Sequence, residues 1–222
     1  MERVPNPVAY RRVRENVARL LGERPEVADR TVPACPDWTV RGLVAHLAEI
    51  CARGLGAPVA EPPPASAAVP DLLRHWNGLA EEFERAVADG TGEMNDLLVA
   101  DAFVHEGDIR AVLGEAMPDG HPAYVGVMEL GILGFSFSLA SHGLPAVGIE
   151  AGDLRWTAGA GEPAITMRGN RHDVVRSIGG RRTHEQIARL SWSADPGPWL
   201  PAFTWGPFTP PAHPVEMPAA DS

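Results

Sequence analysis

One stretch of the chain, residues 97–113, places a carboxylate and an imidazole on an apolar helical face. Read at a helical period, the residues that share this face are Leu97, Asp101, Val104, His105, Asp108 and Val112. Asp101 and His105 are four residues apart, so their side chains should lie one turn apart on the same side. An uncompensated carboxylate in an apolar interior is costly, so we expect Asp101 to have a partner.

Two kinds of partner can satisfy Asp101. A divalent metal ion would satisfy the carboxylate and the imidazole of His105 together. The alternative is an internal hydrogen bond between the two side chains, with both residues structural. The helix alone favours neither, so a third ligand has to come from another part of the chain.

Length, charge and cysteine content narrow the class of protein. A chain of 222 residues can hold one large domain or two small ones. Its formal charge of −10 disfavours a nucleic-acid partner, and the absence of lysine excludes Schiff-base lysine chemistry. Two cysteines and no signal-like start predict a cytoplasmic protein. Residues 125–139 are apolar but contain Glu129, two serines and two glycines, and we expect a buried helix there rather than a membrane span.

Apolar residues at helical spacing predict five helices with short connections, which is typical of a bundle. Gly22 is expected to end the first helix, and Asp37 or Thr39 to cap the second. Residues 56–70, rich in Pro and Ala, are expected to form a loop before a third helix that opens at Pro70. The predicted helices cover residues 8–21, 40–51, 70–87, 97–113 and 124–140.

The composition changes after Pro145, where short strands and helices are expected. Residues 154–158 and 164–168 are interpreted as a hairpin, Asn170 as the cap of a short helix, and Thr183 to Gln186 as a capping box. The Pro-rich tail is expected to be disordered at its end. The predicted fold is α+β: a helical bundle domain at residues 1–145 and a small C-terminal α/β domain with a Pro-rich tail at residues 146–222.

Two motifs resemble a known family. Cys-Pro-Asp-Trp-Thr-Val-Arg-Gly-Leu-Val-Ala-His at residues 35–46, and Asp-Ala-Phe-Val-His-Glu-Gly-Asp at residues 101–108, are similar to the two signatures of the mycothiol-dependent maleylpyruvate isomerase family. These proteins belong to the DinB-like metal-binding helical bundles, with four to five helices in an up-down arrangement. The resemblance spans about residues 8–145, and a weaker one reaches residues 165–170 and 179–182.

The resemblance implies a metal site made by His46, Asp101 and His105, usually for zinc, with mycothiol as the thiol cosubstrate. The family usually has glutamate where this chain has Asp101, and the shorter side chain could weaken the site or leave it empty. Two histidines and one carboxylate leave coordination positions open, as in catalytic sites. A metal-bound thiolate could then attack a small electrophilic substrate. Asp108 could hydrogen-bond a ligand, or only cap or solvate the helix surface.

Other residues have weaker signals. Arg181 and Arg182 are candidates for a clamp on an anionic substrate, although adjacent arginines after a helix end are commonly solvated. Cys35, flanked by Pro residues, is expected to be structural. Three isolated histidines, His142, His172 and His184, are expected at the surface or in caps.

Three functions remain open. The first is a mycothiol-using transferase or isomerase, monomeric or homodimeric, with no nucleic-acid or membrane partner. The second is the same scaffold in a thiol-independent reaction, possible in natural-product biosynthesis, with a weakened or absent metal site. The third is a non-enzymatic binding module, which ranks last because buried polar residues at ligand spacing are costly in a mere scaffold.

Overall fold

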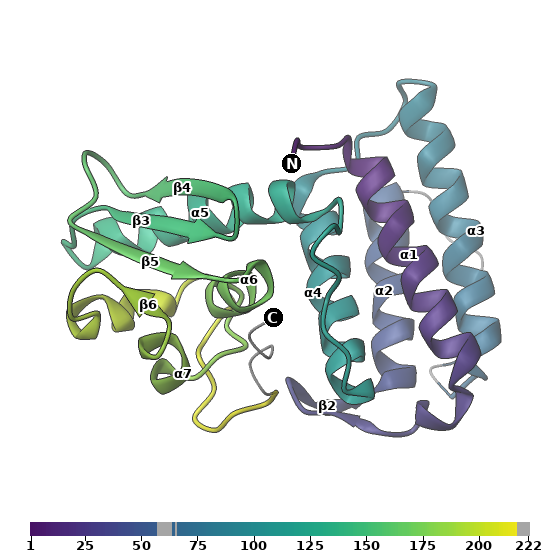
Figure 1. The fold of residues 1–222 in the computed structure, drawn as a ribbon. Helices are drawn as coiled ribbons and strands as arrows, with labels where there is room; N and C mark the ends of the chain where they lie inside the picture. Colours follow the sequence, from purple (N-terminus) through teal and green to yellow (C-terminus); the bar gives the residue numbers. More distant parts are fainter. Residues whose placement is uncertain (57–63, 65, 217–222) are drawn as a thin grey trace. The chain divides into compact units, whose positions relative to one another are not determined.

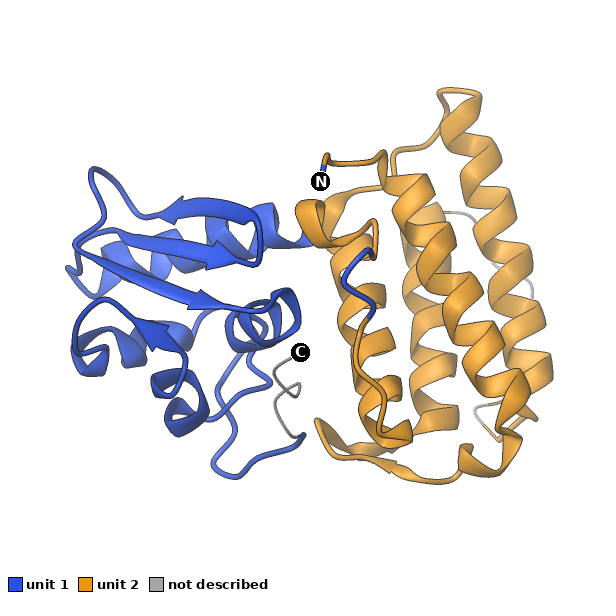
Figure 2. Ribbon diagram, in the orientation of Figure 1, with its two compact units in different colours: residues 1, 118–120, 127–222 blue, residues 2–117, 121–126 orange. Residues whose placement is uncertain are grey.

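The computed structural model describes residues 1–56, 64 and 66–216, and the chain divides into two compact units (Figure 2). The helical unit comprises residues 2–117 and 121–126. The sheet unit comprises residue 1, residues 118–120 and the chain from residue 127 onward. The units divide within α5 (Tyr124–Ser141), earlier than the boundary expected at residue 145. The physical reason is that most of α5 packs on the sheet unit, where Ser136 Oγ accepts from the Gly159 N–H at 2.8 Å.

In the helical unit, four helices pack together as a bundle (Figure 1). Three of them each bury one apolar face, and the fourth is buried over most of its surface. The predicted fold class, a helical bundle with a small α/β part, is confirmed. In the core, the Trp76 indole donates a hydrogen bond to the Tyr10 hydroxyl at 2.8 Å. The first helix continues past Gly22, so the prediction that this glycine ends it was wrong. The helices are α1 (Asn6–Glu23), α2 (Val40–Leu55), α3 (Val69–Ala88) and α4 (Asp96–Leu113).

A short two-stranded ladder leads into α2. After the turn η1 (Pro25–Val27), β1 (Thr31–Val32) pairs antiparallel with β2 (Cys35–Thr39). Thr39 ends the strand and caps α2, because its side chain accepts from the Gly42 N–H at 3.1 Å. Of the two caps predicted from the sequence, Thr39 is therefore the one present. The ladder places the residues of β2 directly before the helix that carries His46.

Both ends of α4 are fixed locally. The Asn95 side chain accepts from the Leu98 N–H at 3.0 Å at the start, and Gly114 adopts a left-handed conformation at the end. Most of α4 is buried, including several charged residues. Leu97, which the helical period placed on the core face, is 67 % exposed in the first turn, so that part of the predicted face was wrong.

A buried polar network joins three segments of the helical unit around Glu106 of α4. Its carboxylate is fully buried and accepts hydrogen bonds from Asn16 at 3.0 Å and from Arg110 at 2.8 Å. The imidazole of His121 lies 3.1 Å from the other carboxylate oxygen, and its Nδ1 accepts from the Ala123 N–H, so Nε2 is the donor. This network ties the connection after α4 to the helices.

The sheet unit contains four strands in the order β4-β3-β5-β6, with α5 along one face (Figure 1). The predicted hairpin was wrong, because β4 and β5 do not pair with each other: β3 lies between them, antiparallel to β4 and parallel to β5. The connection from β4 to β5 therefore crosses over the central strand. The strands are β3 (Val147–Ala151), β4 (Leu154–Ala158), β5 (Ile165–Gly169) and β6 (Ser191–Trp192).

Two short helices and a 3-10 turn complete the sheet unit. Asn170 caps α6 (Arg171–Ile178), and Thr183 and Gln186 form the predicted capping box of α7 (His184–Ala188). The turn η2 (Gly197–Phe203) follows, and its Phe203 ring packs on Phe135 of α5 with centroids 4.6 Å apart. The predicted caps are therefore confirmed.

Among the described residues one helix, α5, is long and apolar enough to cross a membrane by length and composition alone. The stretch predicted to be a buried helix, residues 125–139, lies within this longer helix of 18 residues. Half of the helix is buried within the protein, and core helices of soluble proteins meet the same criteria. Two other predictions, most of the loop at residues 56–70 and disorder at the end of the tail, fall outside the described residues.

Candidate metal centre

Two helices of the helical unit bring His46, Asp101 and His105 together. His46 comes from α2, and Asp101 and His105 lie one turn apart on α4. One donor atom from each side chain lies within 4.8 Å of the other two. The set combines two imidazole nitrogens with one carboxylate oxygen, which is the donor chemistry of zinc sites.

The spacing of these donors fits a shared ion better than direct hydrogen bonds. His46 Nε2 and His105 Nε2 each lie 3.5 Å from Asp101 Oδ1, and His46 Nε2 lies 3.4 Å from Asp101 Oδ2. Good nitrogen-to-oxygen hydrogen bonds are shorter, about 2.7 to 3.2 Å. Ligands held about 2.0 to 2.1 Å from a tetrahedral zinc ion lie about 3.3 to 3.4 Å from one another. Asp101 Oδ2 is also buried and has no hydrogen-bond partner within the described part of the chain. The residues therefore fit a divalent ion.

Asp108 fixes the orientation of one histidine. Its fully buried carboxylate lies 2.9 Å from His105 Nδ1. An Nδ1–H that donates to this carboxylate leaves the lone pair of Nε2 directed away from it, toward Asp101. The predicted hydrogen bond between Asp108 and a ligand candidate is therefore present in the structure.

Strand β2 contributes two residues to the cluster: Cys35, which was expected to be structural, and Trp38, which was not predicted to be a site residue. Cys35 Sγ lies 3.9 Å from Asp108 Oδ2, and Cys35, His105 and Asp108 themselves form a set of closely spaced donor atoms. The Trp38 ring packs against both histidines, with centroids 4.5 Å from His46 and 5.7 Å from His105. The presence of Trp38 in the first motif was the available sequence signal for a site residue on β2. The sequence does not show that β2 lies beside α4.

The electrostatics of the cluster couple proton and metal binding. Burial disfavours the charged form of Asp101, but the attraction of the nearby His105 and His46 imidazoles outweighs it and holds the pKa of Asp101 well below its ordinary value. Burial likewise acts against the charged form of His105, whereas its interactions with Asp101, Asp108 and Cys35 raise the pKa of His105 well above its ordinary value. A cation entering the cluster must displace that proton, so metal affinity should rise with pH.

The two arginines predicted to clamp a substrate belong to the sheet unit. Arg182 is almost completely buried and pairs with Asp173 and Glu216. The Arg181 side chain donates to the Gly179 carbonyl at 3.1 Å. Their clamp role stays a prediction. The expectation that His172 is a surface or capping residue was wrong, because it is 6 % exposed.

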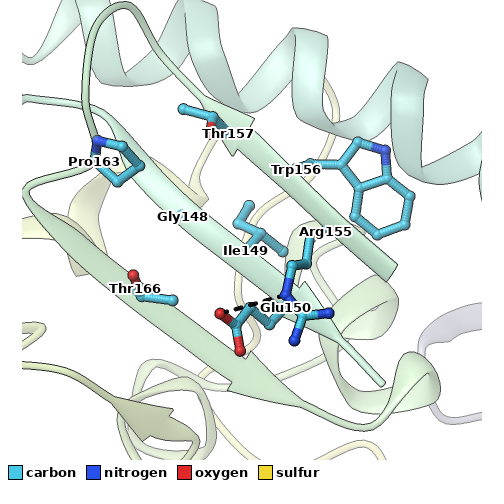
Figure 3. Close-up of a pocket in the computed structure, with 8 residues that line it drawn as sticks. All are labelled: Gly148, Ile149, Glu150, Arg155, Trp156, Thr157, Pro163 and Thr166. Atoms are coloured by element: carbon cyan, nitrogen blue, oxygen red, sulfur yellow. Dashed lines mark ion pairs between the residues drawn. The ribbon is translucent and has the colours of Figure 1, made fainter. Parts of the chain in front are cut away.

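A shallow hollow of about 400 Å³ lies on the sheet unit (Figure 3). Gly148 lines this hollow. A Cβ added at this position would lie 2.9 Å from the Thr166 hydroxyl oxygen. The Glu150 carboxylate at its edge is already paired with Arg155 at 3.8 Å and with Arg168 at 2.7 Å. The hollow therefore does not gather reactive groups as the His46 cluster does.

Comparisons with known proteins agree with the first of the two motifs, residues 35–46. Residues 10–93 match the family model described as the mycothiol maleylpyruvate isomerase N-terminal domain. This segment includes His46 and ends before Asp101, so the case for the α4 residues rests on their geometry. No protein of the curated collection matches the chain.

Two solved structures are similar to the chain. One is a crystal structure of the mycothiol-dependent maleylpyruvate isomerase, 14 % identical, covering 88 % of this chain and 97 % of that chain with a TM-score of 0.50. The other is a crystal structure of a histidine-to-alanine mutant of that isomerase, 15 % identical, with the same coverage and a TM-score of 0.49. At such identity the likeness concerns the fold. The predicted resemblance is thus confirmed: residues 10–93 of the chain are similar to the mycothiol maleylpyruvate isomerase N-terminal domain.

Proposed function

We propose that this protein is a metal-dependent enzyme that uses mycothiol as a cosubstrate in an S-transfer or isomerisation on a small electrophile. The observation that carries the proposal is the convergence of His46, Asp101 and His105 at the spacing of metal ligands. Three protein ligands leave at least one coordination position for a reactant. The family match supports mycothiol as that reactant.

The chain's own residues would share the work as follows. His46, Asp101 and His105 would hold the ion, for which zinc is our candidate. Asp108 keeps the His105 ring in the tautomer that presents Nε2. A bound divalent ion would supply stabilisation of a thiolate, by lowering the pKa of a coordinated thiol. Trp38 packs against both histidines and limits the positions their rings can take.

The thiolate then needs an electrophilic carbon. In an S-transfer it would displace a leaving group. In a cis-to-trans isomerisation it would add to a double bond, allow rotation about the resulting single bond, and leave with its electron pair, so that the thiol is regenerated. The structural relatives are named for maleylpyruvate, and an activated double bond of this kind is the substrate class we propose.

The test combines metal analysis with turnover. Purified protein is assayed for bound zinc and for isomerisation of maleylpyruvate with and without mycothiol, beside His105→Ala and the control His184→Ala. His184 is an exposed residue at the start of α7. We expect His105→Ala to lose zinc and turnover together and His184→Ala to keep both. Retention of both by His105→Ala contradicts the proposal, and zinc with thiol-independent turnover contradicts its mycothiol part.

A further inference from the structure

The C-terminal tail ends, among the described residues, in a carboxylate buried between two arginines of the sheet unit. Glu216 belongs to the tail, Arg176 to α6, and Arg182 to the connection before α7. The side chains of Arg176, Arg182 and Glu216 are only 3 %, 2 % and 6 % exposed. Charged side chains this deeply buried are rare unless they are paired.

The contacts have the form of carboxylate recognition. Arg176 Nε donates to Glu216 Oε1 at 2.5 Å and Arg176 Nη2 donates to Oε2 at 3.1 Å, which is the bidentate geometry of a guanidinium with a carboxylate. Arg182 Nη1 also contacts Oε1. Asp173 holds the opposite edge of Arg182, accepting from Nε at 3.2 Å and from Nη2 at 2.8 Å. The Arg182 guanidinium is thereby fixed with its Nη1 directed at the tail.

The tail is anchored well before it reaches this site. The Trp205 indole donates to the Ile178 carbonyl at 3.0 Å. At Gly180, whose φ is +68°, an added Cβ would lie 2.9 Å from the Thr209 nitrogen, so the tail passes directly over this glycine. Residues 212–214 that follow are exposed and form no helix or strand. We call residues 212–216 the strap. Its residues 212–214 are exposed, and the carboxylate of its last residue, Glu216, is buried.

A buried histidine lies within electrostatic range of the same charges. His172 is 6 % exposed, and its Nδ1 has no hydrogen-bond partner among the described residues. Burial lowers its pKa to about 4, and it interacts electrostatically with Glu216, Arg176 and Arg182. The His172 ring is therefore neutral near pH 7, and its buried Nδ1 makes no hydrogen bond with a described residue.

We propose that Arg176 and Arg182 form a carboxylate-binding site whose resident ligand is the chain's own Glu216, and that a small free carboxylate can take the place of this side chain. Asp173 holds the Arg182 guanidinium through contacts that do not involve the tail, and Arg176 extends from α6 to the same carboxylate. Residues 212–214 are exposed, and the backbone of Glu216 is held by a hydrogen bond, which its carbonyl accepts from Gln186 Nε2 at 3.1 Å. The tail therefore contributes a high local concentration of one carboxylate. This inference is independent of the metal centre and of the proposed function.

The first experiment replaces the resident ligand. Glu216→Ala removes the atoms that acetate, one methyl and one carboxylate, can restore. Thermal unfolding of the full chain is followed against acetate concentration, with chloride holding ionic strength constant. The matched control is Glu162→Ala, which replaces an exposed glutamate between β4 and β5. We expect the Tm of Glu216→Ala to fall and then rise with acetate, while the wild type and Glu162→Ala respond to acetate no more than to chloride.

Equal acetate dependence in all three proteins overturns the proposal. If Glu216→Ala shows no cooperative unfolding transition in chloride, we expect acetate to restore this transition. Failure of acetate to restore it also overturns the proposal.

The second experiment measures amide hydrogen exchange of residues 212–216 in the wild type. We expect exchange to accelerate several-fold in acetate over chloride, because the strap is released. Unchanged exchange contradicts the replacement of Glu216 by a free carboxylate.

Discussion

The hydrogen bond between Asp108 and His105 should control metal affinity. The Asp108→Asn substitution keeps the shape of the side chain but removes the buried carboxylate that lies 2.9 Å from His105 Nδ1. An amide accepts a weaker hydrogen bond from Nδ1–H, and its NH₂ group can instead donate to Nδ1. In that second arrangement the proton moves to Nε2, the atom that faces Asp101 and would bind the ion.

The expected magnitude follows from the burial of this pair. Asp108 is fully buried and His105 is 7 % exposed, so water does not replace the lost interaction. Removal of such a partner from a metal-binding histidine weakens metal affinity by about 10- to 100-fold, which corresponds to about 1.4 to 2.7 kcal/mol. We therefore expect Asp108→Asn to bind zinc within that range of weakening, and not to abolish binding.

The assay is competition for zinc against a chromophoric chelator at fixed pH. Asp37→Asn is the matched control, since Asp37 is an exposed carboxylate of β2 and the substitution changes the net charge equally. Thermal unfolding of both metal-free variants separates loss of affinity from loss of fold. Equal zinc affinity for the two variants would refute the orienting role of Asp108.

Three further predictions concern stability. In urea unfolding, Glu106→Gln should lower the free energy of unfolding by about 3 to 5 kcal/mol, because it leaves buried hydrogen-bond donors without their carboxylate. Gly134→Ala should lose about 1 to 3 kcal/mol, since its Cβ would lie 2.0 Å from the Trp205 ring, whereas Gly78→Ala in α3 has open space and should gain about 0.5 to 1 kcal/mol. Because burial lowers the pKa of His172 from 6.5 to about 4, the unfolded chain binds its proton first on acidification. As the pH falls between those two values, the free energy of unfolding of the wild type should decrease by about 3 kcal/mol more than that of His172→Gln, as measured by unfolding at a series of pH values.

Local hydrogen bonds were the most predictable part of this structure. Thr39, Asn170 and Thr183 each cap a helix by accepting from a backbone N–H three residues later, so the signal lies within one turn of sequence. The same holds for Asp101 and His105, which one helix brings together at a spacing that can be counted. His46 was expected from the family resemblance, and its place beside α4 is a property of the bundle.

Long-range pairing was not predictable in this way. The central strand β3 has the sequence Val-Gly-Ile-Glu-Ala, in which Gly, Glu and Ala have low strand propensity, and it was missed. Because β3 was not predicted, the segments that form β4 and β5 were interpreted as the two paired strands of a hairpin. Cys35 failed to stand out for a similar reason, because its closeness to Asp108 depends on how β2 packs against α4. Burial of His172 likewise depends on packing within the sheet unit and leaves no trace in the local sequence.

The most direct test of the metal centre is the anomalous signal of zinc in crystals of the wild-type protein. Our account predicts a peak about 2.0 to 2.2 Å from His46 Nε2, His105 Nε2 and one Asp101 oxygen, with a further coordination position open to a small ligand. Zinc bound only elsewhere, or the two imidazoles separated with no peak between them, would contradict it.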